Sequence, residues 1–293
     1  MTAQEMSDGL VAGLSAVRPS VVRVEGRRRY ALSGTVWDEH TVVTTSRAVE
    51  RDEGILVGLE TGETHPATLV GRDSGTDLAV LQLETALPVP TWAEGEPQVG
   101  QLVLMAGRPG DTVRAGLGII GMVGGPWRTA LGGRVAFELR ADARTFPGFS
   151  GGPLVTPAGA VLGVNTAALT REGSVTLPTE TVQRVVEALR THGRMRRGYL
   201  GLGGQPVELP GGVQEEAGQR TGLLVTSVEP GAPAADAGLT VGDVVLRFGE
   251  ERVRHPRGLA AFLGEETVGQ AVTVTFARGG VVSEMAVTVA ERP

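Results

Sequence analysis

Short apolar runs rich in Val and Leu follow one another along most of the chain. Runs of this length with many turns between them favour β-structure over a helical bundle. Turn-forming residues, mostly Gly, Pro, Asp and Ser, separate the segments about every 8–12 residues. The predicted strands are SVVRVEG, SGTVWDE, TVVTTS, GILVGLE, HPATLVGRD, DLAVLQLE, LVLMAG, GIIGMV, RVAFELR, PLVTPAGAVLGVNT and VTLP. The spacing favours a mainly β protein, a barrel or a sandwich.

Two segments show helical spacing instead. Residues 2–17 carry apolar side chains three and four positions apart and end before Pro19. Residues 179–192 form a second predicted helix, and Gly193 provides the stop signal. The apolar face of this second helix consists of Val182, Val185, Val186 and Leu189.

The basic connector RMRRG, residues 194–198, leads into a second β-rich unit that contains a predicted short helix at 256–263. Residues 199–293 hold 12 acidic and 7 basic residues, so they carry −5 of the chain's net charge of −6. We therefore predict two domains, 1–198 and 199–293.

Composition narrows the possible chemistry. The net charge of −6 disfavours binding to nucleic acid, and the absence of cysteine excludes disulfides and thiolate metal sites. The four histidines, at 40, 65, 192 and 255, are not spaced as metal ligands, so we expect no metal and no cofactor.

The N-terminal residues lack the basic and apolar regions of a signal peptide, and no apolar stretch approaches the ~20 residues of a membrane span. For the sequence as given we therefore expect a cytoplasmic location. The run Arg27-Arg28-Arg29 is interpreted as a solvated loop, and Tyr30, Trp37 and Trp127 as packing residues.

PGFSGGPL, residues 147–154, is the strongest chemical signal. Glycines on both sides of a serine let a substrate backbone approach, and consecutive amides can converge on a developing oxyanion. Two alternatives remain open. The motif also fits the G-x-S-x-G elbow, but that elbow needs a helix directly afterwards, whereas a strand, turn and strand are predicted here. The other alternative is a glycine-rich turn without chemistry. GLGIIG, residues 116–121, matches a dinucleotide motif by letter only, since no βαβ unit surrounds it.

Taken together, PGFSGGPLV…VLGVNT, GRDSGTDLAVLQLE and SGTVWDEHTVVTTSRAVE resemble the HtrA/Deg family, trypsin-like serine proteases with a C-terminal PDZ domain. The resemblance runs from about residue 10 to the end and keeps the order of the three motifs. It implies a double β-barrel followed by a PDZ domain. It also implies polypeptide ligands.

The resemblance assigns roles to single residues. Ser150 takes the nucleophile position, Asp77 that of the orienting acid, and the amides of Gly148 and Ser150 form the oxyanion hole. Further substrate-cleft positions are Ala141, Asp142, Thr145, Asn165, Thr166, Ala168 and Leu169, of which Thr145, Ala168 and Leu169 imply a small or medium apolar P1 residue. Phe149 departs from the family, which has asparagine there.

Arg47 stands where the family has its catalytic histidine. A general base must be neutral and able to titrate near pH 7, and arginine offers no lone pair. We expect Arg47 to pair with Asp77 instead, since its guanidinium matches a carboxylate. His40 lies in a turn seven residues upstream and is not expected to replace the base.

GYLGL (198–202) and EPGAPAADAGLTVGDVVLRFGEERV (229–253) resemble the PDZ domain of the same family. In such domains a C-terminal peptide adds to a sheet edge and its carboxylate meets loop amides. The implied peptide-binding residues are Tyr199, Leu200, Gly201, Leu202, Leu259, Phe262 and Leu263, although about half of the apolar ones would serve equally as core. The family often trimerises through N-terminal aromatics, and none precedes Tyr30.

Three hypotheses follow. The first is a pseudoprotease that binds unfolded or C-terminal segments in protein quality control or regulation. The second is an active serine endopeptidase with a remodelled site around Ser150. The third is an unrelated β-barrel binding protein whose motifs are accidental.

Overall fold

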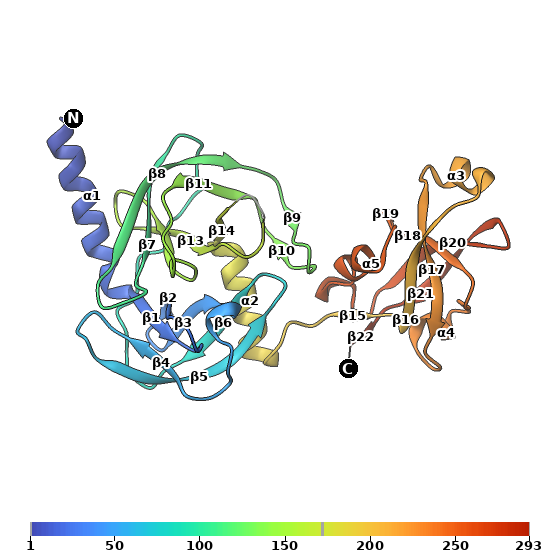
Figure 1. Ribbon diagram of the computed structural model, residues 1–293, viewed down its shortest axis with the longest axis horizontal. Helices are drawn as coiled ribbons and strands as arrows, with labels where there is room; N and C mark the ends of the chain where they lie inside the picture. The colour runs from blue at the N-terminus through green and yellow to red at the C-terminus, as the bar shows by residue number, and fades with distance from the viewer. Residues whose placement is uncertain (1, 171–172, 293) are drawn as a thin grey trace. The chain divides into compact units, whose positions relative to one another are not determined.

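The computed structural model describes residues 2–170 and 173–292, and its contacts divide the chain into two compact units (Figure 1). The first unit runs to Thr129 and resumes over Arg134–Met195. The second consists of Ala130–Gly133 and the chain from Arg196 onward. Each unit has its own hydrophobic core, so each is described separately.

The first barrel of the first unit closes in the antiparallel order β1-β2-β3-β6-β5-β4. Its core consists of side chains on the inward faces of these strands, among them Val22, Val36, Val42 and Leu81. The strands are β1 (Val21–Glu25), β2 (Leu32–Asp38), β3 (Thr41–Thr45), β4 (Ile55–Gly58), β5 (Thr64–Asp73) and β6 (Leu78–Gln82).

The second barrel closes in the order β11-β14-β13-β12-β7-β8. Its core contains Val103, Met105, Ile120 and Leu154. The strands are β7 (Leu102–Gly107), β8 (Arg114–Val123), β11 (Leu139–Ala143), β12 (Pro153–Val155), β13 (Val161–Thr166) and β14 (Val175–Pro178), and a separate pair is formed by β9 (Trp127–Arg128) and β10 (Arg134–Val135).

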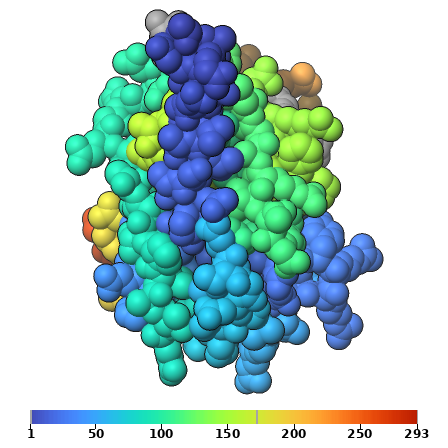
Figure 2. All heavy atoms as spheres, turned by 90° about the vertical axis from the view of Figure 1, so that its left-hand side faces the viewer, coloured from blue at the N-terminus to red at the C-terminus, as the bar shows by residue number. Residues whose placement is uncertain are grey.

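Helix α1 (Ala3–Val17) lies along the outside of the second barrel (Figure 2). Thr2 and Glu5 form a capping box at its start, and Leu10, Leu14 and Val17 pack against the barrel. The contact is close because Gly13 has no side chain: a Cβ there would lie 2.2 Å from the carbonyl oxygen of Pro157.

Helix α2 (Thr179–His192) ends the first unit and joins its two barrels. Its buried face packs into a cluster to which both barrels contribute, and we call this cluster the seam. Gly193, with φ of 68°, ends the helix in the left-handed conformation. The seam consists of Val43, Leu78, Val80, Val135, Val164, Leu177, Val182, Val185, Val186 and Leu189.

The second unit is a sheet in the order β16-β17-β18-β20-β21, with β19 beside β18 and a separate β15–β22 pair. Its core includes Leu223, Val245, Phe276 and Val287. The strands are β15 (Gly198–Tyr199), β16 (Leu202–Glu208), β17 (Thr221–Val228), β18 (Val244–Phe248), β19 (Glu251–Arg252), β20 (Ala271–Arg278), β21 (Val281–Thr288) and β22 (Ala290–Glu291), and the helices are α3 (Gly211–Ala217), α4 (Pro233–Asp236) and α5 (Pro256–Phe262).

The predicted mainly β fold with two barrels is confirmed, and so is the helix over 179–192. One predicted strand is wrong in extent. Residues 134–140 divide into β10 and the start of β11, because Arg134 and Val135 pair with β9 while Leu139 pairs with β8 and β14. The short helices α3 and α4 were not predicted. Within the described residues, no helix combines the length and the apolar character that a membrane crossing would require.

Candidate active site

Ser150 lies in the tight turn between β11 and β12. Its hydroxyl forms no hydrogen bond with any described residue, and neither does the backbone N–H of Gly148 or of Ser150 donate one within the described chain. Gly148 has φ of 93°, and a Cβ there would lie 2.3 Å from Cβ of Pro109, so only glycine fits this position. The turn therefore presents an unpaired hydroxyl and two unpaired amides.

Ser33 of β2 holds this turn from the inside of the protein. Its N–H donates to the carbonyl oxygen of Ser150 over 3.1 Å, and its hydroxyl donates to the carbonyl oxygen of Gly148 over 2.7 Å. The N–H of Arg108 donates in turn to the Ser33 hydroxyl over 2.8 Å. Because Ser33 is fully buried, these bonds are shielded from water and fix the turn against the first barrel.

Asp77 precedes β6, and its carboxylate is buried. The hydroxyl of Thr166 donates to Oδ2 over 2.6 Å, and the backbone N–H of Arg47 donates to Oδ1 over 3.3 Å. Asp77 itself adopts φ of 58°, which aspartate tolerates better than most residues. Burial raises the pKa of Asp77 above its ordinary value, and the Thr166 bond and the Arg47 charge offset this only in part.

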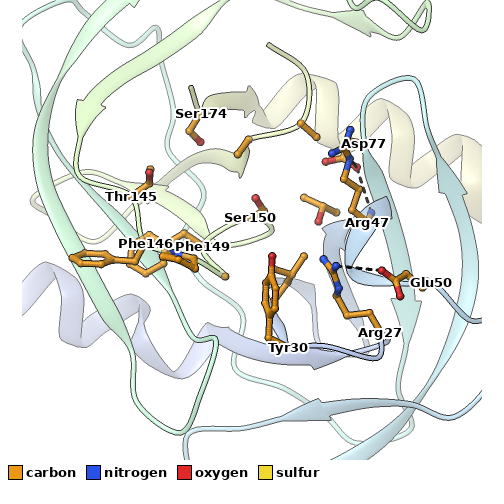
Figure 3. Close-up of a pocket in the computed structure, with 16 residues that line it drawn as sticks. Arg27, Tyr30, Arg47, Glu50, Asp77, Thr145, Phe146, Phe149, Ser150 and Ser174 are labelled. Carbon is orange, nitrogen blue, oxygen red and sulfur yellow. Dashed lines mark hydrogen bonds and ion pairs between the residues drawn. The ribbon is translucent and has the colours of Figure 1, made fainter. Parts of the chain in front are cut away.

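Arg47 lies in the 3₁₀ turn Ser46–Ala48 that follows β3. Its Nε is 3.9 Å from Oδ1 of Asp77, and its side chain is 68% exposed. The expected ion pair is therefore present as a single long contact, without the two parallel hydrogen bonds that a guanidinium and a carboxylate can form. The guanidinium remains accessible from the cleft (Figure 3).

A cleft of about 660 Å³ connects these groups. Ser150, Arg27 and Tyr30 point into it (Figure 3). Among the described residues no histidine lines it. His255, for example, lies at the start of α5, where its Nδ1 accepts the N–H of Gly258. The expected residues that line the cleft are Arg47, Asp77, Thr145, Gly148, Ser150 and Ala168.

Sequence reasoning missed part of this lining. Arg27, Tyr30, Glu50, Phe146 and Ser174 also line the cleft. Tyr30 was expected to pack inside the protein, but it is 52% exposed, and the guanidinium carbon of Arg27 lies 4.7 Å from its ring centroid. The sequence RRRY does contain a signal for a cleft-lining pair, an aromatic residue directly after a basic run, but this signal is weak.

Three of the other expected cleft residues have structural contacts instead of cleft positions. Asn165 is buried; its amide donates to the carbonyl oxygen of Gly152 and its oxygen accepts from Thr176. Thr166 holds Asp77, and Leu169 packs against the seam. Ala141 and Asp142 line a neighbouring hollow of about 430 Å³ with Thr145.

Phe149 is buried in the second barrel, and its ring centroid lies 5.3 Å from that of Phe146. The side chain packs into this core and also lines the cleft beside Phe146.

The second unit has a hollow of about 270 Å³ beside β15 and α5. Within the described chain the N–H groups of Leu200 and Gly201 donate no hydrogen bond, whereas their carbonyl oxygens accept from Ala234 and Glu229. Phe262 packs against the core of this unit. The expected residues that line the hollow are Tyr199, Leu200, Gly201, Leu202, Leu259 and Leu263.

Comparison with known families gives two matches along the chain. The family described as trypsin-like peptidase domain matches residues 32–164, and the PDZ domain family matches residues 198–289. The first match covers most of both barrels, and the second covers nearly all of the second unit.

Two curated relatives are similar to most of this chain. Serine endoprotease DegS of Escherichia coli (strain K12) is 33% identical over 281 residues, which cover 89% of this chain and 77% of that protein. A protein of Halomonas elongata named "Probable periplasmic serine endoprotease DegP-like" is 32% identical over 277 residues. The match covers 92% of this chain but only 58% of that relative, so the chain spans little more than half the relative's length.

Solved structures agree in fold. The structure entitled "HtrA-type protease AlgW with decapeptide" superposes with a TM-score of 0.73 at 26% identity, covering 97% of this chain and 99% of that one. The serine endoprotease from Yersinia pestis superposes with a TM-score of 0.72 at 29% identity, covering 97% and 98%. In both cases the similarity extends over both units.

Proposed function

Since this chain belongs to the HtrA family of trypsin-like serine endoproteases with a PDZ domain, we propose that it is a pseudoprotease, which binds polypeptide segments without cutting them. The observation that carries the proposal is Arg47 beside Asp77, in a cleft that no histidine lines within the described residues. A serine hydroxyl needs a neutral group to accept its proton, and a guanidinium cannot do so.

In this proposal the remaining groups bind rather than react. The amides of Gly148 and Ser150 donate to a carbonyl oxygen of the bound segment, and their lack of described partners supports this role. Thr145 and Ala168 take a small or medium apolar side chain, as their place in the cleft lining supports. Asn165, Thr166 and Leu169 shape the cleft from behind.

The second unit takes the C-terminus of a polypeptide. The amides of Leu200, Gly201 and Leu202 receive the carboxylate, while Leu259 and Leu263 contact the last side chain. Two observations support this: these residues line one hollow, and the N–H groups of Leu200 and Gly201 have no partner among the described residues. The role we propose for the whole chain is to hold unfolded or C-terminal segments in quality control or regulation.

A second candidate is an active serine endopeptidase with a remodelled site. The unpaired Ser150 hydroxyl and the two unpaired amides favour it, because the acceptor of the acyl group and the oxyanion donors are all in place. It requires a proton acceptor other than histidine.

Exchange of one side chain tests both candidates. Casein cleavage is measured for the natural protein and for Arg47→His. We expect negligible turnover in the first and a large gain in the second, because loss of the histidine in a serine protease costs about 10⁶ in kcat. The imidazole introduced by Arg47→His would lie within reach of the Asp77 carboxylate, which would orient it.

Ser150→Ala in both backgrounds is the control. Hydrolysis by the natural protein that disappears in Ser150→Ala would establish the endopeptidase and exclude the pseudoprotease. Labelling of Ser150 by a fluorophosphonate reports the same distinction directly. If Arg47→His also stays inactive, the defect extends beyond Arg47 to Phe149 or the turn.

A further inference from the structure

Arg27 is fixed beside the Arg47 turn by backbone pairing. Gly26 and Val49 form a parallel bridge, and the N–H of Glu50 donates to the carbonyl oxygen of Gly26 over 2.9 Å. A Cβ on Gly26 would lie 2.7 Å from the carbonyl oxygen of Ala48, so a side chain at this position would clash with that backbone. The end of β1 therefore delivers the next side chain, Arg27, into the cleft (Figure 3).

The Arg27 side chain is held in one place. It is only 17% exposed, its guanidinium stacks on Tyr30, and one terminal nitrogen lies 3.2 Å from Oε1 of Glu50. An arginine ordered in this way loses little conformational entropy when a ligand binds.

Two buried donors of the cleft lack acceptors. Nε of Arg27 and Oγ1 of Thr45 are both shielded from solvent without a hydrogen-bond partner among the described residues, and both residues line the cleft. A buried N–H without an acceptor costs free energy, more so when it belongs to a charged group. Both atoms thus favour a ligand that brings acceptor oxygens.

The charged groups that line the cleft are Arg27, Arg47, Glu50 and Asp77. Glu50 contacts a single nitrogen of Arg27, and Asp77 reaches Arg47 only at 3.9 Å. The two guanidinium groups thus keep N–H groups that the two carboxylates do not use. The rest of the wall combines apolar residues such as Leu32, Phe146 and Pro147 with uncharged polar ones such as Thr145 and Ser174.

We propose that the cleft selects a polypeptide segment with an acidic side chain, whose carboxylate binds between Arg27 and Arg47. The proposal rests on the proposed function, since it specifies which segments the cleft holds. On this basis Arg47, which stands at the position of the family's proton-accepting histidine, also forms an anion-recognition pair with Arg27.

The test uses the full chain and amidated nonapeptides of Ala and Val that carry one Glu, placed in turn at each position, with Gln counterparts. Amidation removes the C-terminal carboxylate that the second unit would bind. We expect at least one Glu peptide to bind about tenfold or more tightly than its Gln counterpart, since charge-assisted hydrogen bonds are lost with Gln. The preference should weaken as salt increases.

Arg27→Gln should reduce this ratio to about one, whereas the matched variant Arg29→Gln should keep it. Arg29 lies in the same loop and carries the same charge, but it does not line the cleft. Equal binding of every Glu and Gln pair would overturn the inference while leaving the proposed function intact, and so would a preference that survives in Arg27→Gln. Failure of all peptides to bind would count against the proposed function itself.

Discussion

Asp77 and Arg47 are neighbours in space, yet their side chains are held in very different ways. Asp77 is buried and accepts two hydrogen bonds, from Thr166 and from the backbone of Arg47. The Arg47 guanidinium is mostly exposed and reaches Asp77 through one long contact. In the proposed function Asp77 stands at the position of the orienting acid, but the side chain beside it offers no lone pair.

The pKa of Asp77 leads to a stability prediction. Burial raises this pKa above the ordinary 3.8, so the folded state takes up a proton more readily than the unfolded chain. The stabilising contribution of the protonated form is present below pH 3.8 and is lost as pH rises through the native pKa. Relative to Asp77→Asn, the natural protein should therefore lose stability between about pH 4 and pH 7.

Unfolding in guanidinium chloride, at about pH 4 and at about pH 7, measures the difference in stability between the natural protein and Asp77→Asn. Asp243→Asn provides the contrast. Burial raises the pKa of Asp243, but the hydrogen bonds from Arg278 and Thr240 outweigh it and hold the pKa below its ordinary value. Its contribution is present above pH 3.8 and is lost as pH falls, so this variant should be most destabilising at neutral pH. The same pH trend in both variants would contradict the assignment for Asp77.

Among the elements, β2 of the first barrel holds the turn of the second barrel that carries Ser150. The N–H and the hydroxyl of Ser33 donate hydrogen bonds to the turn, and the N–H of Arg108 donates to the Ser33 hydroxyl. The turn that carries Ser150 is thus fixed by a strand more than 100 residues earlier in the chain. A turn held in this way can keep its amides pointed at the cleft.

Ser33→Ala should leave the carbonyl oxygen of Gly148 and the N–H of Arg108 without partners. We expect a loss of about 1–3 kcal/mol in unfolding free energy for each unsatisfied group. In the Arg47→His background, the rate at which a fluorophosphonate labels Ser150 should also fall, because the oxyanion donors are no longer fixed.

Ser20→Ala is the matched control. Ser20 is equally buried and donates to the carbonyl oxygen of Pro88, in a part of the first unit that does not line the cleft. It should lose about 1–3 kcal/mol for the one carbonyl left without a partner, while the labelling rate is kept. Equal loss of labelling in both variants would reduce Ser33 to a general stabilising residue.

At the scale of the whole molecule, the two units have separate cores. The seam draws residues from both barrels and from α2, whereas the core of the second unit contains only residues of that unit. The two barrels should therefore unfold together, and the second unit should unfold in a transition of its own.

Leu189→Ala tests this expectation by calorimetry. Leu189 is fully buried in the seam, so its truncation should destabilise the first unit by about 2–5 kcal/mol and lower only its transition. Leu223→Ala, fully buried in the second core, should lower only the other transition. A shift of both transitions by either variant would show that the units unfold as one.

Most strand segments, the helix over 179–192 and the order of the three motifs followed from the sequence alone, because apolar runs and helical spacing are local properties. The sequence also determined that residue 47 offers no lone pair, since that follows from the side chain alone. The place of Ser150 in a glycine turn followed in the same way from the residues around it.

Only the tertiary structure decided which side chains meet. Arg27 and Tyr30 reach the cleft because the end of β1 pairs with the turn at Val49, a long-range contact that no local pattern encodes. Asn165 is buried through its bond to Gly152, and Leu169 packs against the seam, so neither lines the cleft. The tertiary structure also decided the contacts of Asp77, whose carboxylate meets the hydroxyl of Thr166 and the backbone N–H of Arg47 while the Arg47 guanidinium stays 3.9 Å away.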